Sequence, residues 1–540
     1  MSRPTFDPEP GTLLPLGPNA VLITTHDARG ARALAVGLSR DLPGVEVTPG
    51  LCSVLVSGVA PLDRSRLLTL IEGDHNVPED PMTLHEIPVT PDGPDLQEAA
   101  QLLGLSPAEI VRELLDQELE VAVLGFSPGF GYLTGLRGPL ASLARRSTPR
   151  ARVPAGSLAV ASGMAAIYPQ SSPGGWWLLG TSDVVLFDQD ASPPALFAPG
   201  DHVRFVDAAR CAAATPRPRP PHARSTDGAL EVVATSPWIT VVDAPRRSVA
   251  AFGVPPSGPF DSERAWLARQ LVGGAEAGVE VTGTGLALRA HRPVTIAAVD
   301  LAIRIDGRAA PEGTPVAMGV EQELRVERLG LGNLGYLAIA GGPGGRSVFH
   351  SRGTDLLSQV GPGPLQVGDH LEGGVASSSL PRHARPIPRG PVVLRISAGP
   401  HESCLVGGMS ALDGWGGIVD GASSKVGVRF RGSDEPLPRR RGEITSIPVV
   451  TGAVQVPPDA TAIVLGPDHA TLGGYPIPAV VIEADLALLG RLSPGERVTF
   501  RVVDPVITDE EQRKRHAVLA SLLEGASPGS EDQGRLANWG

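Results

Sequence analysis

Short apolar runs separated by turn residues dominate the chain, and the first of them predict a small mixed domain. Residues 20–23 are apolar and indicate a strand. After Asp27, apolar residues recur at helical spacing, at Ala31, Leu34, Ala35, Leu38 and Leu42. Later runs predict strands, a helix and a last strand at residues 45–47, 52–56, 64–71 and 84–89. Because β-α-β-β-α-β is the ferredoxin-like order, we expect a tail over residues 1–17 and a ferredoxin-like α+β domain over residues 18–94.

The next segment begins with helices and continues as strands. Asp95 opens one predicted helix, and Ser106 opens another, with a capping-box glutamate at Glu109 and proline at the first helical position. Beyond Val121 the pattern changes to short strands and turns. This predicts a barrel-like module over residues 95–207.

Two distant segments share one arrangement of glycine, proline and a single aromatic residue. The first consists of the motifs at residues 153–157, 174–176 and 199–205. The second consists of the motifs at residues 456–459, 473–475 and 494–500. Because the copies lie about three hundred residues apart, they indicate a duplicated β-rich module, not a short-period solenoid.

Proline-rich breaks divide the rest of the chain. Residues 208–228 contain a Thr-Pro-Arg-Pro-Arg-Pro-Pro run, which lacks strand donors and predicts an extended linker. A second break lies at residues 377–389. We therefore expect a first β-barrel half over residues 229–388, a second half over residues 389–505, and a partly helical C-terminal tail over residues 506–540.

Composition supports a mainly β protein and argues against several functions. The 540 residues include 66 glycines and 54 prolines, which favours short strands and tight turns. The net charge is −12 and no basic stripe occurs, so nucleic acid is not an expected partner. The sequence contains no run of about 18 apolar residues, which is the length that a membrane helix needs. Three widely spaced cysteines fit a reducing compartment, and we expect a cytoplasmic protein.

Two glycine motifs match known functional patterns, but the residues that follow each motif argue against that function. Residues 125–129 match the G-x-S-x-G pattern of serine hydrolases, but Pro128 follows the serine and has no N–H for an oxyanion hole. Residues 330–335 match the nucleotide-binding G-x-G-x-x-G pattern. A strand pattern follows instead of a helix, so this motif predicts a hairpin turn. The two lysines, Lys425 and Lys514, form no P-loop.

Several motifs together resemble a known family. Residues 87–89, 93–96, 125–133 and 154–176 resemble the B subunit of 5-oxoprolinase, also described as the kinase-A inhibitor or allophanate hydrolase subunit 1 family. The C-terminal half resembles the C subunit of 5-oxoprolinase, the biotin-dependent carboxyltransferase-like or allophanate hydrolase subunit 2 family, through residues 253–259, 280, 341–342, 455–457 and 473–476.

The resemblance implies a fusion of the B and C subunits with tandem cyclophilin-like β-barrels. It further implies ATP-dependent opening of 5-oxo-L-proline to L-glutamate, with ATP as cofactor, Mg²⁺ accompanying it, and, as partner, a separate protein similar to the A subunit of 5-oxoprolinase. This activity implies a small-molecule substrate. Whether the protein forms a homo-oligomer is left open. Two alternatives remain: a degenerate binding or regulatory protein similar to histidine-kinase inhibitors, and a component of urea or allophanate metabolism.

The resemblance also implies site residues, each taken from a matching motif. The expected catalytic residues are Asp261, Glu280, Arg150 and Arg152. The expected substrate-binding residues are Ser127, Ser157, Ser172, Trp176, Ser257, Arg352, Gln455, Asp468, Thr471 and Tyr475. No protein-held metal is expected, because metal-ligand spacing is missing. Asp261 has the alternative role of capping a helix, and Glu280 of pairing with Arg246 or Arg264.

The chain departs from the family pattern at several polar positions. Residues 164–166 and 180–183 replace segments that carry polar or cationic groups, and Leu114 stands where the family has a histidine. Residues 242–246 depart from the usual Gln-Asp-x-Gly-Arg segment, and Lys425 replaces an expected arginine. These changes motivate the regulatory alternative, because each lost donor weakens substrate or phosphate binding.

Overall fold

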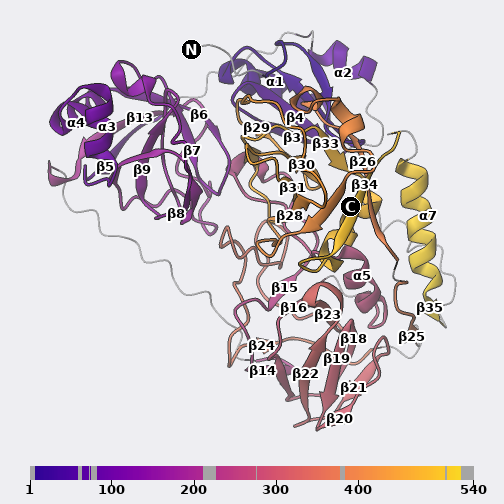
Figure 1. The fold of residues 1–540 in the computed structure, drawn as a ribbon. Coiled ribbons are helices and arrows are strands. Elements are labelled where there is room, and N and C mark those ends of the chain that lie inside the picture. The colour runs from indigo at the N-terminus through magenta and orange to yellow at the C-terminus, as the bar shows by residue number, and fades with distance from the viewer. Residues whose placement is uncertain are drawn as a thin grey trace.

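The computed structural model of the protein describes residues 6–58, 64–71, 73, 82–210, 227–274, 277–376, 383–388, 390–504 and 508–524. Figure 1 shows a small α/β domain above one barrel, which we call the second barrel (residues 392–502). The first barrel (residues 84–207) lies to one side, and a unit of two sheets lies below. The prediction of a mainly β protein with two barrels and a small α+β domain is confirmed. Among the described residues, no helix has the length and apolar character needed to cross a membrane.

The small domain packs helices on one face of a sheet and the second barrel on the other. Its strands pair in the order β1 (Leu13–Pro15), β2 (Ala20–Thr24), β4 (Ser53–Ser57) and β3 (Glu46–Pro49). Its helices are α1 (Ala28–Asp41) and α2 (Arg64–Ile71), and Asp27 caps α1 by accepting from Gly30 N at 2.8 Å. Alternation explains the two faces: Ile23 and Val54 join the helix side, whereas Leu22 and Leu55 join the barrel side.

Two boundaries of this domain differ from the prediction. Residues 84–89 form β5, which pairs with the first barrel instead of completing a ferredoxin-like sheet. The expected tail over residues 1–17 includes β1 and Asp7, whose carboxylate accepts from Thr445 N at 2.9 Å. Both differences come from pairing between segments distant in sequence, which local periodicity does not encode.

The first barrel occupies residues 84–207. All of these residues are described in the structure, and they form a seven-stranded sheet. Its strands are β5 (Leu84–Val89), β6 (Glu118–Leu124), β7 (Gly131–Thr134), β9 (Ser157–Ala161), β10 (Met164–Ile167), β12 (Trp177–Thr181) and β13 (His202–Asp207). Reciprocal backbone hydrogen bonds of 2.8 Å between Thr90 and Thr181 join its two edges. Helices α3 (Leu96–Leu103) and α4 (Pro107–Leu115) cover one face, and β8 (Arg150–Val153) pairs with β11 (Ser172–Gly174). The capping box at Ser106 and Glu109 is confirmed.

The second barrel, over residues 392–502, repeats this topology. Its closed sheet consists of β26 (Val392–Ala398), β27 (Gly416–Val419), β28 (Gly427–Gly432), β30 (Ala453–Gln455), β31 (Ala462–Leu465), β33 (Ala479–Val481) and β34 (Arg497–Val502). A small hairpin, β29 (Ile447–Pro448) with β32 (Leu472–Gly473), lies beside it. Numbered along the chain, the strands of both barrels pair in the order one, seven, two, three, five, four, six, and strands one and seven are parallel in each. The predicted duplication is therefore confirmed.

The region predicted as a β-barrel half over residues 229–388 consists of two sheets that share one core. The six-stranded sheet contains β14 (Leu230–Ala234), β17 (Ala287–Ala290), β19 (Leu301–Ile305), β20 (Arg308–Ala309), β22 (Glu323–Leu329) and β24 (His370–Leu371). The five-stranded sheet contains β15 (Thr240–Val242), β16 (Gly278–Thr282), β18 (Val294–Val299), β21 (Val316–Met318) and β23 (Leu334–Ile339). Helix α5 (Ser262–Gln270) packs on the second of these sheets. We call this region the two-sheet unit.

Residues 508–524, part of the predicted C-terminal tail, pack against the folded body. Helix α7 (Thr508–Ser521) runs along the edge of the molecule in Figure 1, and its Leu519 joins the core around α5. Strand β35 (Leu523–Glu524) pairs with β25 (His383–Ala384) inside the second predicted break. Short α6 (Glu483–Leu486) precedes Arg491. Most of the predicted linker over residues 208–228 lies outside the described residues.

Candidate active site

Four polar side chains meet where the two-sheet unit contacts the second barrel. The Lys425 ammonium lies 3.1 Å from Glu280 Oε1 and 3.8 Å from Asp468 Oδ2. The Ser257 hydroxyl donates to Asp468 Oδ1 at 2.7 Å. We call Ser257, Glu280, Lys425 and Asp468 the carboxylate–lysine cluster. All but Lys425, whose side chain is 19% exposed, are buried.

Turns and strand ends bring these four residues together. Glu280 lies in the middle of β16, and Lys425 lies in the turn between β27 and β28. Asp468 lies in the turn after β31, where its N–H donates to Lys425 O at 3.2 Å. Ser257 has a positive φ of 59°, and its N–H donates to Pro467 O at 2.9 Å. These backbone contacts hold the two turns against the loop before α5.

The electrostatics of this cluster place a titratable carboxyl near neutrality. Burial raises the pKa of Asp468 to about 7, and the nearby Lys425 ammonium only partly opposes that rise. Burial also acts on Lys425, but the Asp468 and Glu280 carboxylates outweigh it and raise the Lys425 pKa. Asp468 can therefore gain or lose a proton at neutral pH while Lys425 stays charged, as acid–base catalysis requires.

The loop before α5 and Tyr336 hold Glu280 from the other side. Phe260 N and the Tyr336 hydroxyl each donate to Glu280 Oε2 at 2.8 Å. The same hydroxyl accepts from Asp261 N at 2.8 Å. Since Oε2 has these two donors, Glu280 presents Oε1 to Lys425 in a fixed orientation.

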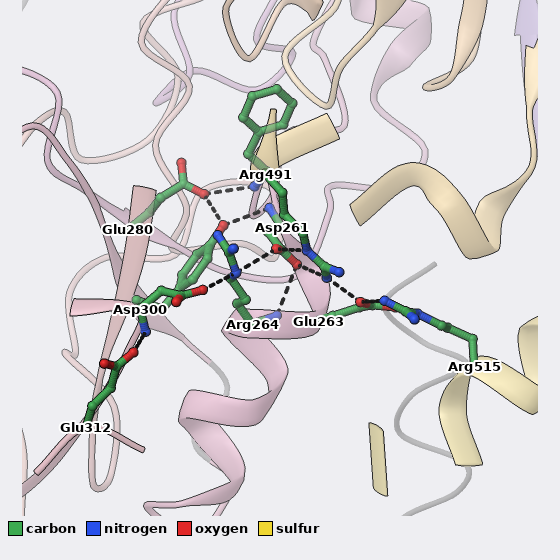
Figure 2. Close-up of polar contacts among 10 residues, drawn as sticks. Asp261, Glu263, Arg264, Glu280, Asp300, Glu312, Arg491 and Arg515 are labelled. Atoms are coloured by element: carbon green, nitrogen blue, oxygen red, sulfur yellow. Dashed lines mark hydrogen bonds and ion pairs between the residues drawn. The ribbon is translucent and has the colours of Figure 1, made fainter. Parts of the chain in front are cut away.

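Asp261, predicted as a catalytic residue, lies at the start of α5 among arginines. It caps α5 by accepting from Arg264 N at 3.1 Å, and Arg491 of the second barrel donates to both of its oxygens, at 2.6 and 3.0 Å. Although burial opposes ionisation, Arg491 and Arg264 lower the Asp261 pKa. Glu263 accepts from Arg491 and from Arg515 of α7, as Figure 2 shows. The predicted alternative, that Asp261 caps its helix, is therefore confirmed, and the ion pairs of Asp261 and Glu263 together join α5 to the second barrel and to α7.

The predicted serines and threonine have different partners. In the part of the chain that the structure describes, the buried hydroxyls of Ser127, Ser172 and Thr471 have no hydrogen-bond partner. The buried Ser157 pairs with Thr181 through the backbone of the first barrel. Gln455 lies buried in β30, beside Gly473.

The predicted residues of the first barrel do not contact the carboxylate–lysine cluster in any described interaction. Arg150 pairs with Asp95 at 2.5 Å, and the exposed Arg152 donates to Ser171 at 3.0 Å. Trp176 packs edge-on against Phe130 at 6.1 Å, in a buried group that also includes Leu472 of the second barrel. Its ring therefore fills space between the barrels. The remaining two predicted residues lie elsewhere: Arg352 N donates to Asp243 Oδ2 at 2.8 Å, and Tyr475 is 36% exposed.

Sequence reasoning missed four residues of this region. Lys425 was noted only as a replacement for arginine, although it is one of two lysines in 540 residues. Tyr336, Arg246 and Asp355 were not predicted as site residues, and all three are buried. Burial raises the pKa of Asp355, and the Arg246 and Lys425 charges oppose that rise. The rarity of lysine was the one usable signal in the sequence.

Comparison with known proteins supports the resemblance of each half of the chain to a 5-oxoprolinase subunit. Residues 12–197 match the family model "Carboxyltransferase domain, subdomain C and D", and residues 252–502 match "Carboxyltransferase domain, subdomain A and B". The chain is 38% identical over 174 residues to the B subunit of 5-oxoprolinase from Escherichia coli O157:H7, covering 31% of this chain and 79% of that protein. It is 26% identical over 305 residues to the C subunit of 5-oxoprolinase from Haemophilus influenzae, covering 54% of this chain and 97% of that protein.

One solved structure aligns over most of the chain. The crystal structure of TTHA0988 aligns with a TM-score of 0.75 and 33% identity, covering 89% of this chain and 99% of that one. Other matches cover less of the relative: 47% of the 5-oxoprolinase B subunit from Bacillus subtilis and 18% of urea amidolyase from Lachancea kluyveri, to which this chain is 26% identical over 332 residues. The chain therefore belongs to the carboxyltransferase-domain family, with a half similar to the B subunit of 5-oxoprolinase followed by a half similar to the C subunit of that enzyme.

Proposed function

We propose that this protein is the B/C component of an ATP-dependent 5-oxoprolinase and acts with a separate A subunit to open 5-oxo-L-proline to L-glutamate. The similarity of each half to a named 5-oxoprolinase subunit supports the reaction class. The observation that carries the proposal is the carboxylate–lysine cluster, in which the Asp468 carboxyl, with a pKa of about 7, lies 3.8 Å from the Lys425 ammonium.

The cluster has the groups that opening a lactam needs. Breaking the ring amide places negative charge on the carbonyl oxygen and requires a proton on the departing nitrogen. In the proposed reaction, Lys425 stabilises the developing charge and Asp468 exchanges the proton. Glu280 keeps Lys425 in place, and Ser257 holds Asp468 through its 2.7 Å hydrogen bond.

ATP is a co-substrate in this proposal, with Mg²⁺ accompanying its phosphates. The two arginines expected to be catalytic have other partners: Arg150 pairs with Asp95, and Arg152 donates to Ser171. Among the residues that the structure describes, no group of three or more His, Cys, Asp or Glu side chains is arranged to hold a metal ion. These residues do not form a phosphate–metal site, so we assign no step to ATP within this chain.

The test measures glutamate released from 5-oxo-L-proline by the full chain mixed with ATP and its cognate A subunit. We expect release that depends on both proteins and on ATP, and that Asp468→Asn abolishes. Asp459→Asn, at an exposed aspartate, is the matched control. Glutamate at the background level with the unmodified chain would rule out this activity.

A second candidate is turnover of urea or allophanate, which the similarity to urea amidolyase favours. The same complex, assayed for ammonia released from each compound, decides between the two. The regulatory alternative, binding of a histidine kinase, stays a prediction. Copurification of a kinase without the A subunit would support it.

A further inference from the structure

A network of ion pairs joins helix α7 to the start of helix α5, as Figure 2 shows. Arg515 of α7 donates to both oxygens of Glu263, and its Nη2 lies 2.6 Å from Oε2. Glu263 Oε2 also accepts from Arg491 Nη2. Arg491 in turn donates to both oxygens of Asp261, at 2.6 and 3.0 Å. Arg515 is therefore linked to the cap of α5 through two shared partners.

Helix α7 is placed to supply this charge because it packs against two units of the fold. Its Glu511 accepts from Arg395 of the second barrel at 2.6 Å, and its Leu519 lies in the core around α5. Arg515 lies four residues from each of them, so the three side chains share one face of the helix. Contacts on both sides thus hold Arg515 at Glu263.

The loop before α5 meets the second barrel at both of its ends. At one end, the Ser257 hydroxyl donates to Asp468 Oδ1 at 2.7 Å. At the other end, Arg491 binds Asp261, and a Cβ added to Gly490 would lie 2.9 Å from Asp261 N. Because the backbone of Gly490 packs so closely, this part of the second barrel determines where the loop lies.

The same loop determines how Glu280 faces Lys425. Phe260 N and the Tyr336 hydroxyl each donate to Glu280 Oε2 at 2.8 Å, and Asp261 N donates to that hydroxyl at 2.8 Å. Glu280 Oε1 lies 3.1 Å from the Lys425 ammonium. A displacement of Asp261 therefore disturbs both donors that orient Glu280.

Without Arg515, Glu263 would compete with Asp261 for Arg491. The two carboxylates are 7% and 0% exposed, and Arg491 Nη2 donates to each of them. A buried carboxylate that loses a cationic partner is costly. Loss of Arg515 would therefore draw Arg491 toward Glu263 and weaken its hold on Asp261.

We propose that Arg515 of α7 is a positioning residue for the carboxylate–lysine cluster. By pairing with Glu263, Arg515 leaves Arg491 bound to Asp261. Asp261 then fixes the loop before α5, and this loop fixes the orientation of Glu280. The inference rests on the proposed function for the reaction that the cluster serves, whereas the positioning itself can be measured without substrate.

The first test is fluorine NMR of the full chain labelled with 3-fluorotyrosine, without the A subunit. The chain has four tyrosines, and Tyr336→Phe identifies the resonance of Tyr336. We expect Arg515→Met to shift that resonance, because the Asp261 N–H moves away from the Tyr336 hydroxyl, and to leave the other three in place. Adding Glu263→Gln should reverse the shift, because it removes the competing charge. Arg513→Met, at an exposed arginine of α7, is the matched control and should shift none.

The second test measures glutamate release by the same variants with the A subunit and ATP. We expect R515M to lower kcat about tenfold and to leave KM nearly unchanged, because a small displacement of catalytic groups slows the chemical step. The double variant R515M/E263Q should recover kcat. If Arg515 served only to dock α7, E263Q would not rescue the loss, since this substitution removes the ion-pair partner of Arg515.

The outcomes separate this inference from the proposed function. An unchanged Tyr336 resonance in R515M, a shift that E263Q does not reverse, or a shift of all four resonances would overturn the inference. A reversible shift with an unchanged kcat would also overturn it, because the orientation of Glu280 would then not affect the reaction. If the unmodified complex releases no glutamate, the proposed function fails, while the NMR result still decides whether Arg515 positions the cluster.

Discussion

Replacing Asp468 by asparagine should change how the stability of the protein depends on pH. The folded protein holds a proton on Asp468 up to a pKa of about 7, whereas its ordinary value is 3.8. Between these values the folded state binds more protons than the unfolded state, so stability falls as pH rises. The fall amounts to about 1.4 kcal/mol per pH unit, or about 4 kcal/mol over the whole interval.

Asparagine resembles the protonated carboxyl and still accepts from Ser257. We therefore expect D468N to match the unmodified protein near pH 4 and to be more stable by a few kcal/mol near pH 8. Urea unfolding, followed by circular dichroism at several pH values, measures the difference between the two proteins. The exposed control D459N should follow the unmodified protein throughout. Parallel curves for D468N and the unmodified protein would refute a raised Asp468 pKa.

Three further predictions concern single side chains. Lys425→Met should lower glutamate release about 100-fold or more, because it removes the ammonium that stabilises the developing negative charge, whereas Lys425→Arg keeps the charge and should retain most activity. Arg491→Met leaves the Asp261 carboxylate buried with fewer partners, and should lower the free energy of unfolding by about 3–5 kcal/mol; an unchanged melting temperature would contradict this. Gly361→Ala combines a positive φ with a backbone clash, whereas Gly363→Ala at φ +86° meets open space. Thermal unfolding should show the larger loss for Gly361→Ala, by about 1–3 kcal/mol, and equal losses would argue against the crowded loop.

The sequence supported prediction of the two barrels because their signals are local. Turn glycines and prolines recur in the same order around residues 154–205 and 457–500, and each marks a strand end. The sheets of the two barrels share one strand order. The partner of β5 was not predictable in this way, because its parallel neighbour β13 begins more than a hundred residues later.

The candidate site could be predicted only in part, for a related reason. Ser257, Glu280 and Asp468 were expected from motifs, but the Ser257–Asp468 hydrogen bond joins residues 211 positions apart. Lys425 has no motif around it, and its role depends on Glu280 from another unit of the fold. Asp261 shows the converse: a motif position was correctly identified, but its partner Arg491 lies 230 positions away and determines what the carboxylate does.

The fusion of both halves in one chain bears directly on the contact between the first barrel and the two-sheet unit. Gln189 reaches Gly361 across a contact that also includes the Gly129 N to Phe252 O hydrogen bond of 2.9 Å and the Phe187–Phe349 ring contact at 6.2 Å. When two surfaces belong to one chain, their association is intramolecular, with an effective concentration on the order of millimolar. A modest contact then stays formed. Two separate proteins would need a stronger contact to hold Gln189 against Gly361.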